Sequence, residues 1–280
     1  MTVGRTVALP SGEIIPALGL GTWHMGETAA RRGDEVAALK TGIDLGLTVI
    51  DTAEMYANGG AESVVAEAIA GQRQKVFLVS KVLPSNASLK GTIAACERSL
   101  ARLKTDVIDL YLLHWRGGTP LAETVRAFET LKRDGKIRHW GVSNFDVDDL
   151  AELSRVENGN RCMANQVQYA LDTRGVEFDL LPWQKQRSMP LMAYCPLGGG
   201  GLVKHPALAP IAGKHGVTAA AVAIAFLLAR PGVLAIPKSA NAGRVAELAR
   251  AREVGLDAED LAALDRAFPP PRRKQPLAMT

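Results

Sequence analysis

Cysteine is scarce in this chain of 280 residues, which holds only Cys96, Cys162 and Cys195, far apart and in no paired motif. Such spacing argues against a disulfide framework and against a cysteine zinc site, and it fits a reducing compartment. The five histidines are also scattered, and none lies four residues from another. We therefore expect no metal centre and a cytoplasmic protein.

Long apolar runs are absent as well. The longest, residues 217–229, is rich in alanine, includes Thr218 and ends before Arg230. It is shorter than the roughly 18 uninterrupted apolar residues that a membrane span requires. Residues 1–5 lead into a polar turn and not into an apolar segment, so we also expect no signal peptide.

Charge of one sign is in small excess, because 33 basic residues face 29 acidic ones for a net charge of +4. The only dense basic run, residues 272–274, lies in a proline-rich tail. This distribution does not predict a nucleic-acid partner, and a mildly basic surface suits an anionic small ligand equally well. We expect a small-molecule partner, no membrane, and a monomer.

Strand and helix patterns alternate along most of the chain, in which 47% of residues are hydrophobic. Short apolar runs with β-branched residues suit strands that are covered on both faces, as in a parallel sheet. The predicted strands are residues 18–21, 48–51, 76–79, 108–113, 137–142, 164–167, 190–194 and 233–236. The predicted helices are residues 34–45, 61–70, 89–103, 119–133, 147–153, 176–186, a stretch ending at 229, 242–251 and 258–268.

Eight strand-helix units predict a (β/α)8 TIM barrel with an N-terminal hairpin and an extra C-terminal helix. We expect one domain over residues 1–280, with the hairpin in 1–17, a two-residue turn at Ser11 and Gly12, and a tail at 269–280. A doubly wound open sheet is the alternative. Its usual glycine fingerprint is incomplete here, because the first turn, from Gly19 to His24, lacks the third glycine.

Polar side chains follow three consecutive predicted strands, namely Asp51 and Tyr56, then Lys81, then His114. The carboxyl ends of barrel strands share one face, where the chemistry of such enzymes sits. Each residue alone has a plainer reading, as a surface ion pair for Lys81 and Asp51 or a core histidine for His114, but all four together favour an active site. We expect Lys81 to lower the pKa of Tyr56, Asp51 to hold Lys81 charged, and His114 to bind a substrate oxygen.

These motifs resemble the aldo-keto reductases along nearly the whole chain. In the family's order they are Leu-Gly-Leu-Gly-Thr-Trp (18–23), Ile-Asp-Thr-Ala-Glu-Met-Tyr (50–56), Val-Ser-Lys-Val (79–82), Asp-Leu-Tyr-Leu-Leu-His-Trp (109–115), Gly-Val-Ser-Asn-Phe (141–145), Asn-Gln-Val-Gln-Tyr (165–169) and Ile-Pro-Lys-Ser (236–239). The chain looks most like short bacterial reductases of methylglyoxal and other small aldehydes. The resemblance implies hydride transfer from NADPH to a carbonyl carbon, with Tyr56 protonating the oxygen.

The resemblance also implies the residues that bind NADPH. Amide and hydroxyl groups would hold the nicotinamide, Tyr194 would stack on its ring, and a basic helix start with Lys238 and Arg244 would hold the 2′-phosphate, since helix starts attract anions. Cys195 stands where many relatives have serine, and Leu248 where many have asparagine. The predicted cofactor set is Gly21, Thr22, Trp23, Asp51, Ser143, Asn144, Gln166, Tyr194, Cys195, Pro196, Leu197, Gly199, Ile236, Pro237, Lys238, Ser239, Asn241, Arg244 and Glu247.

The substrate is expected to contact Trp23, Tyr56, His114 and Trp115. The segments that set specificity in larger relatives look short at residues 115–119 and 269–280, which predicts an open, weakly selective pocket for small aldehydes and 2-oxoaldehydes. Two other functions stay open. One is an NADP(H)-binding regulatory or sensor subunit with little turnover, and the other is an unrelated barrel hydrolase or isomerase that binds no nicotinamide.

Overall fold

The computed structural model describes residues 5–280, so residues 1–4 of the predicted hairpin segment, and with them the expected lack of a signal peptide, lie outside the described residues. Strands β1 (Thr6–Ala8) and β2 (Ile14–Pro16) pair antiparallel as the predicted hairpin. Its loop has three residues and not two, because the Leu9 N–H donates to the Glu13 carbonyl at 2.8 Å. Gly12 adopts a φ of +87°, the left-handed conformation that commonly closes such a loop.

Eight parallel strands follow in sequence order within one sheet: β3 (Leu20–Gly21), β4 (Val49–Asp51), β5 (Phe77–Val82), β6 (Ile108–Leu113), β7 (Ile137–Ser143), β8 (Asn165–Gln168), β9 (Leu191–Tyr194) and β10 (Val233–Ala235). The first and last strands meet at a seam. Leu18 forms a parallel bridge with Ala235, and the Gly19 N–H donates to the Ala235 carbonyl at 2.9 Å. The sheet therefore closes, which confirms the predicted barrel; the open-sheet alternative is wrong.

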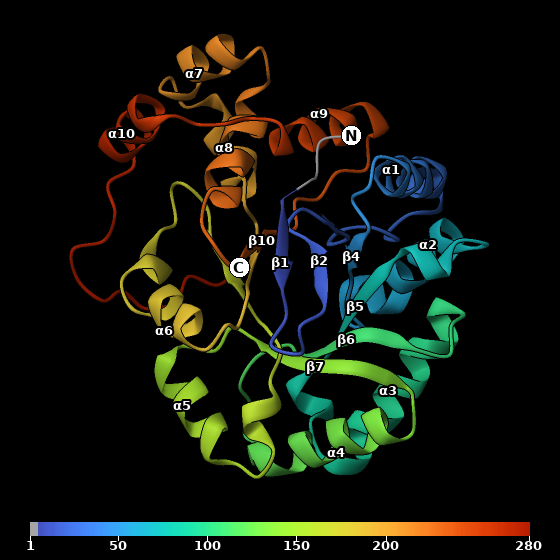
Figure 1. Ribbon diagram of the computed structural model, residues 1–280. Coiled ribbons are helices and arrows are strands. Elements are labelled where there is room, and N and C mark those ends of the chain that lie inside the picture. The colour runs from blue at the N-terminus through green and yellow to red at the C-terminus, as the bar shows by residue number, and fades with distance from the viewer. Residues whose placement is uncertain (1–4) are drawn as a thin grey trace.

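Helices surround the barrel on its outside (Figure 1). They are α1 (Arg32–Asp44), α2 (Gly60–Ile69), α3 (Leu89–Leu103), α4 (Leu121–Arg133), α5 (Val147–Arg155), α6 (Leu180–Gln186), α7 (Leu208–His215), α8 (Ala219–Leu228), α9 (Ala242–Ala249) and α10 (Ala258–Ala267). The predicted helix at 176–186 begins later, at Leu180, because Pro182 fits only in a first helical turn. The stretch before 229 forms two helices, since Gly216 ends α7 at a φ of +60°.

Within residues 5–280 we find no single helix with the length and hydropathy of a membrane span, and α7 and α8 meet that test only as a pair bent by 88°.

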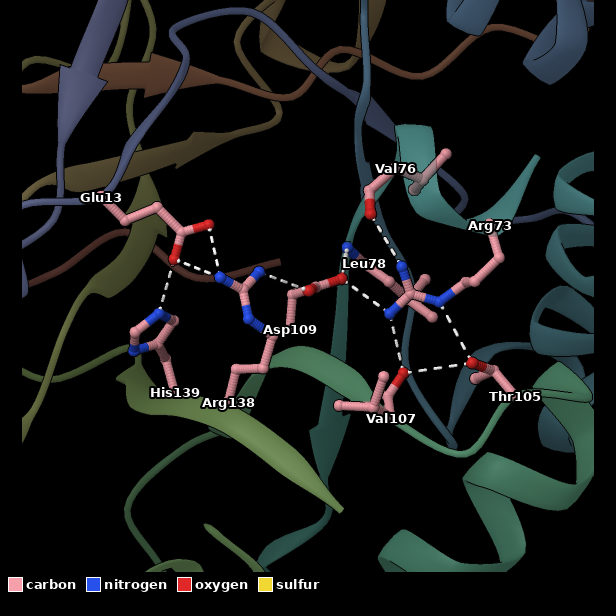
Figure 2. A network of polar contacts seen from close by, with 9 residues as sticks. All are labelled: Glu13, Arg73, Val76, Leu78, Thr105, Val107, Asp109, Arg138 and His139. Carbon is pink, nitrogen blue, oxygen red and sulfur yellow. Dashed lines mark hydrogen bonds and ion pairs between the residues drawn. The ribbon is translucent and has the colours of Figure 1, made fainter. Parts of the chain in front are cut away.

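A polar network joins the hairpin to the amino-terminal rim of the barrel (Figure 2). Asp109, near the start of β6, is 4% exposed, and its carboxylate accepts hydrogen bonds from Arg73 at 2.7 Å, Arg138 at 2.8 Å and the Leu78 N–H at 2.8 Å. Arg138 also donates to Glu13 of the hairpin at 2.8 Å. Ion pairs and hydrogen bonds centred on Asp109 and Arg138 therefore connect the hairpin to strands β5, β6 and β7.

Replacing Asp109 by asparagine should lower the free energy of unfolding by about 2 kcal/mol, because two guanidinium groups lose a buried partner although they remain partly hydrated. Urea denaturation measures this loss. Asp134→Asn is the matched control, since Asp134 pairs with Arg133 on the surface and should cost less than about 0.5 kcal/mol. Equal losses in the two variants would contradict a structural role for the network.

Candidate active site

The carboxyl ends of β4, β5 and β6 place the four predicted catalytic side chains around one buried ammonium. Lys81 is fully buried, and its Nζ donates to Asp51 Oδ2 at 2.7 Å, to the Thr52 carbonyl at 3.0 Å and to the Tyr56 hydroxyl at 3.1 Å. The His114 ring meets the Tyr56 ring edge to face, with centroids 5.8 Å apart. All three donors of the ammonium are used, so it has one fixed orientation.

Local backbone geometry brings Tyr56 back over the barrel mouth. Asp51 is the last residue of β4, and the chain turns at once, since the Tyr56 N–H donates to the Ala53 carbonyl at 3.1 Å. Ala57 and Asn58 then adopt left-handed φ values of 49° and 52° before α2 begins. Tyr56 therefore lies on a tight turn, with a backbone hydrogen bond to Ala53 before it and two left-handed residues after it.

Burial decides the pKa of Tyr56. It raises the pKa above the usual value of roughly 10, Lys81 opposes this rise, and Asp51 adds to it. Lys81 lowers the pKa of Tyr56 as predicted, but burial, which the prediction did not include, raises it by more. The phenol stays protonated through neutral pH, which is the form that a proton donor needs.

The neighbouring groups are held in defined charge states. Burial lowers the pKa of Lys81, but Asp51 and Tyr56 more than offset this, so the pKa is raised. Burial raises the pKa of Asp51, and the hydrogen bonds from Lys81 and from the Gln166 amide, both 2.7 Å, oppose this rise without cancelling it. Burial and Lys81 lower the pKa of His114 to about 3. His114 is therefore a neutral imidazole with one N–H donor.

A second group of side chains continues from Gln166 along β7, β8 and β9. Ser143 Oγ donates to the Gln166 carbonyl at 2.9 Å, and the Asn144 amide donates to Ser143 Oγ at 3.2 Å. The Tyr194 hydroxyl donates to Asn144 Oδ1 at 2.9 Å, which fixes the ring. The Ser143 hydroxyl and both N–H groups of the Asn144 amide donate within the protein, whereas Gln166 uses one of its two; the side-chain oxygens of all three residues retain acceptor capacity. They suit a ligand group that donates hydrogen bonds.

A cavity of about 400 Å³ lies beside Tyr56 and His114. Fifteen predicted residues line it: Gly21, Thr22, Trp23, Asp51, Tyr56, His114, Trp115, Ser143, Asn144, Gln166, Tyr194, Cys195, Pro196, Ile236 and Lys238. Three further residues, Met55, Met279 and Thr280, were not predicted. Met55 lies within the motif at 50–56 and directly precedes Tyr56, but no local pattern indicates that the tail returns to this cavity.

A second cavity of about 720 Å³ shares Lys238 with the first. Its walls include the predicted residues Leu197, Lys238, Ser239, Asn241, Arg244 and Glu247. Gly199 and Pro237 line neither cavity; Gly200 lines the second one instead, and the Pro237 carbonyl accepts the Gly21 N–H at 3.0 Å within the barrel seam. The structure therefore gives these two predicted residues no place in the cavity walls.

Three cations face the second cavity, namely Arg31, Lys238 and Arg244. None of them forms an ion pair with any side chain in residues 5–280. Burial, and then repulsion from Arg31, lower the pKa of Lys238. A bound anion would relieve this repulsion. Sequence reasoning missed Arg31, because it meets Lys238 only where the first and last strands join.

The chain matches the family model of the aldo/keto reductase family over residues 17–268. It is 53% identical over 275 residues to methylglyoxal reductase YeaE of Escherichia coli (strain K12), which covers 96% of this chain and 97% of that relative. It is 36% identical over 261 residues to glyoxal reductase of Bacillus subtilis (strain 168), with 93% and 91% covered.

Two solved structures have the same fold. An aldo/keto reductase from Klebsiella pneumoniae in complex with NADP and acetate has a TM-score of 0.97 and 53% identity, and the match covers 99% of this chain and 100% of that one. A K. pneumoniae aldo-keto reductase in complex with NADPH also gives 0.97 and 53%, with both chains fully covered. The chain therefore belongs to the aldo/keto reductase family.

Proposed function

We propose that this chain reduces small aldehydes and 2-oxoaldehydes such as methylglyoxal, with NADPH as the hydride donor and Tyr56 as the general acid. The chain is an NADP-dependent oxidoreductase that acts on carbonyl compounds. The observation that carries the finer proposal is the Tyr56 hydroxyl, 3.1 Å from the Lys81 ammonium in the wall of a cavity. The relatives named for methylglyoxal and glyoxal support the substrate class.

The residues present fit the nicotinamide end of NADPH. Ser143, Asn144 and Gln166 line the first cavity with free acceptor capacity, which matches the two N–H donors of a carboxamide. The half-buried Tyr194 ring is held in the wall of the same cavity by Asn144. When bound, NADPH supplies the hydride for the carbonyl carbon.

The residues present also fit the phosphate end. The two cavities share Lys238, so one extended ligand can occupy both. Arg31, Lys238 and Arg244, which form no ion pair within residues 5–280, supply three cations where a dinucleotide carries its phosphates. Guanidinium groups bind phosphate with two parallel hydrogen bonds, which favours Arg31 and Arg244 for this contact.

The proposed proton transfer follows from the hydrogen-bond directions. Lys81 donates to the Tyr56 oxygen, so the Tyr56 proton is left for a substrate oxygen in the cavity. Neutral His114 can donate a second hydrogen bond to the same oxygen. Two donors aimed at the place where negative charge develops stabilise the transition state. After the transfer, the Lys81 ammonium stabilises the phenolate of Tyr56.

Turnover separates catalysis from the two other functions. We expect steady consumption of NADPH with methylglyoxal and small aldehydes, and a much lower kcat/KM with a steroid ketone, because the cavity holds only about 400 Å³. Tight NADPH binding without turnover on an aldehyde panel would favour a regulatory subunit. No NADPH binding at all would favour an unrelated barrel enzyme.

Arg244→Ala should weaken NADPH binding about tenfold and NADH binding less than about twofold, because only NADPH carries the 2′-phosphate and a charge-assisted hydrogen bond contributes about 1.4 kcal/mol. Fluorescence titration with both dinucleotides measures the two dissociation constants. Arg250→Ala, at the exposed far end of α9, is the matched control and should change neither. Equal losses for NADPH and NADH would mean that the phosphate contact is misassigned.

A further inference from the structure

The tail after α10 returns to the active-site cavity. It passes through the prolines at 269–271, and its residues Met279 and Thr280 line the cavity together with Tyr56 and His114. In Figure 1 the red tail leaves α10 and runs toward α6. The predicted open pocket therefore has an additional wall, supplied by the tail.

Lys274 ties this tail to two loops of the barrel. Its Nζ lies 3.0 Å from Asp146 Oδ2 and 3.0 Å from Asp179 Oδ2. Asp146 precedes α5 and Asp179 precedes α6, so one ammonium joins the tail to the connections after β7 and β8. The hydrogen bonds that Lys274 donates to the Asp179 and Asp146 carboxylates raise its pKa, which keeps it charged. It is the only residue of 269–280 that forms an ion pair with the described part of the chain.

Contacts on either side of Lys274 set the course of the tail. Gln275 lies against Gly175, where an added Cβ would meet its side chain at 3.3 Å, and Leu277 packs on the hydrophobic core. At the end of this path Thr280 Oγ1 lies 3.8 Å from Cys195 Sγ. The tail therefore crosses the ends of β7, β8 and β9 and ends beside the Cys195 thiol.

We propose that Lys274 is a positioning residue: by clamping the tail to Asp146 and Asp179, it holds Met279 and Thr280 in the cavity wall and restricts the site to small carbonyl compounds. The size restriction rests on the proposed function, whereas the clamp itself does not. Lys274 is 43% exposed, and exposed ion pairs contribute little and are screened by salt. The clamp therefore favours the docked tail over the released tail by a small factor. Its loss should change the ratio of the two states a few-fold.

The Cys195 thiol reports tail docking without any turnover. Cys96 and Cys162 are 0% and 2% exposed, whereas Cys195 is half-buried beside Thr280. Lys274→Ala should raise the rate at which an aromatic disulfide reagent labels Cys195 about threefold, because exposed ion pairs of this kind change populations by about two- to fivefold. Cys195→Ser should remove the fast-labelled thiol. An unchanged labelling rate in Lys274→Ala, measured with and without saturating NADPH, overturns the clamp.

Three further variants separate the clamp from general damage. Asp179→Asn should reproduce the faster labelling, and it is the cleaner partner to change because Asp146 also caps α5 through the Val147 N–H at 2.7 Å, whereas Asp179 makes no such bond. Lys274→Arg should restore labelling to within about twofold of the wild type. Arg273→Ala, which removes a neighbouring cation that forms no ion pair within residues 5–280, should have no effect.

Kinetics at saturating NADPH test the size restriction. In Lys274→Ala we expect the KM for methylglyoxal to rise about threefold with kcat nearly unchanged, and the preference for methylglyoxal over a naphthaldehyde to fall by a similar factor. Raising NaCl from about 0.05 M to about 0.5 M should move the wild type toward the variant and leave the variant unchanged. Faster labelling with unchanged substrate preference overturns the size restriction. If the wild-type protein does not turn over NADPH with any aldehyde, the proposed function is refuted. The labelling rate of Cys195 would still show whether Lys274 holds the tail in place.

Discussion

Replacing Tyr56 by phenylalanine should lower kcat for aldehyde reduction by about two to four orders of magnitude, which is the usual contribution of a positioned general acid. The change removes one hydroxyl and leaves the ring against His114. NADPH binding should stay within about twofold of the wild type, because no predicted cofactor contact is lost. Steady-state kinetics and a fluorescence titration measure the two effects, and near-normal turnover would refute the role of Tyr56.

The pH dependence gives a second readout of the same variant. Because the pKa of Tyr56 is raised above roughly 10, the wild type should keep its acid form through neutral pH and lose reductase activity only in the alkaline range. The residual activity of Tyr56→Phe should lack this alkaline loss. Tyr111→Phe is the matched control, since Tyr111 is fully buried on β6 outside both cavity walls and its loss should leave kcat unchanged.

Replacing Lys81 by methionine should lower kcat by about two orders of magnitude or more, because the phenolate left after proton transfer loses the ammonium that stabilises it. The free energy of unfolding should also fall by about 3 kcal/mol, since Asp51 keeps a buried charge without its partner. Asp51 is 2% exposed, and among residues 5–280 only the Gln166 amide would still bind its side chain. Urea denaturation and steady-state kinetics measure the two losses.

The double variant Lys81→Met with Asp51→Asn separates stability from catalysis. Removing both charges leaves no uncompensated ion, so most of the lost unfolding free energy should return. Turnover should not return, because the ammonium beside Tyr56 is still missing. Recovery of kcat together with stability would mean that Lys81 acts only by keeping the fold intact.

Elements with complete local signals could be predicted to the residue. The helix at 89–103 is α3 as observed, because Ser88 caps its start by accepting the Gly91 N–H at 3.1 Å and Lys104 ends it at a φ of +51°. Strand β6 has the predicted bounds as well, and its end is marked by the change from the apolar run of residues 110–113 to the polar His114. Local caps and apolar runs carry enough information when no distant partner is needed.

The end of strand β5 could not be predicted from local sequence patterns. The prediction stopped it at residue 79, because Ser80 and Lys81 look like surface residues, but β5 continues to Val82 and both are fully buried. Ser80 Oγ donates to Glu62 at 2.7 Å, and Lys81 pairs with Asp51. These partners come from other parts of the chain, so a window of neighbouring residues does not reveal them.

The residues of the candidate site also fall into two groups, those that local patterns predict and those that only the folded structure reveals. The residues at strand ends could be predicted, because parallel strands bring their carboxyl ends to one rim. Arg31 could not, since it reaches Lys238 across the barrel seam, and neither could Met279, which arrives with the tail. The net rise in the pKa of Tyr56 could not be predicted either, because burial is a property of the folded molecule and not of the motif.

Asp109 lies near the start of β6, and His114 directly follows the end of the same strand. The charges that fasten the hairpin therefore share no side chain with the groups proposed to carry out proton transfer, and the packed core separates them. Effects at sites without common partners add nearly independently. Thermal stability and catalytic activity can thus be changed separately in this protein. Substitutions that raise its heat resistance can be placed at the amino-terminal rim of the barrel, away from the groups proposed to transfer the proton.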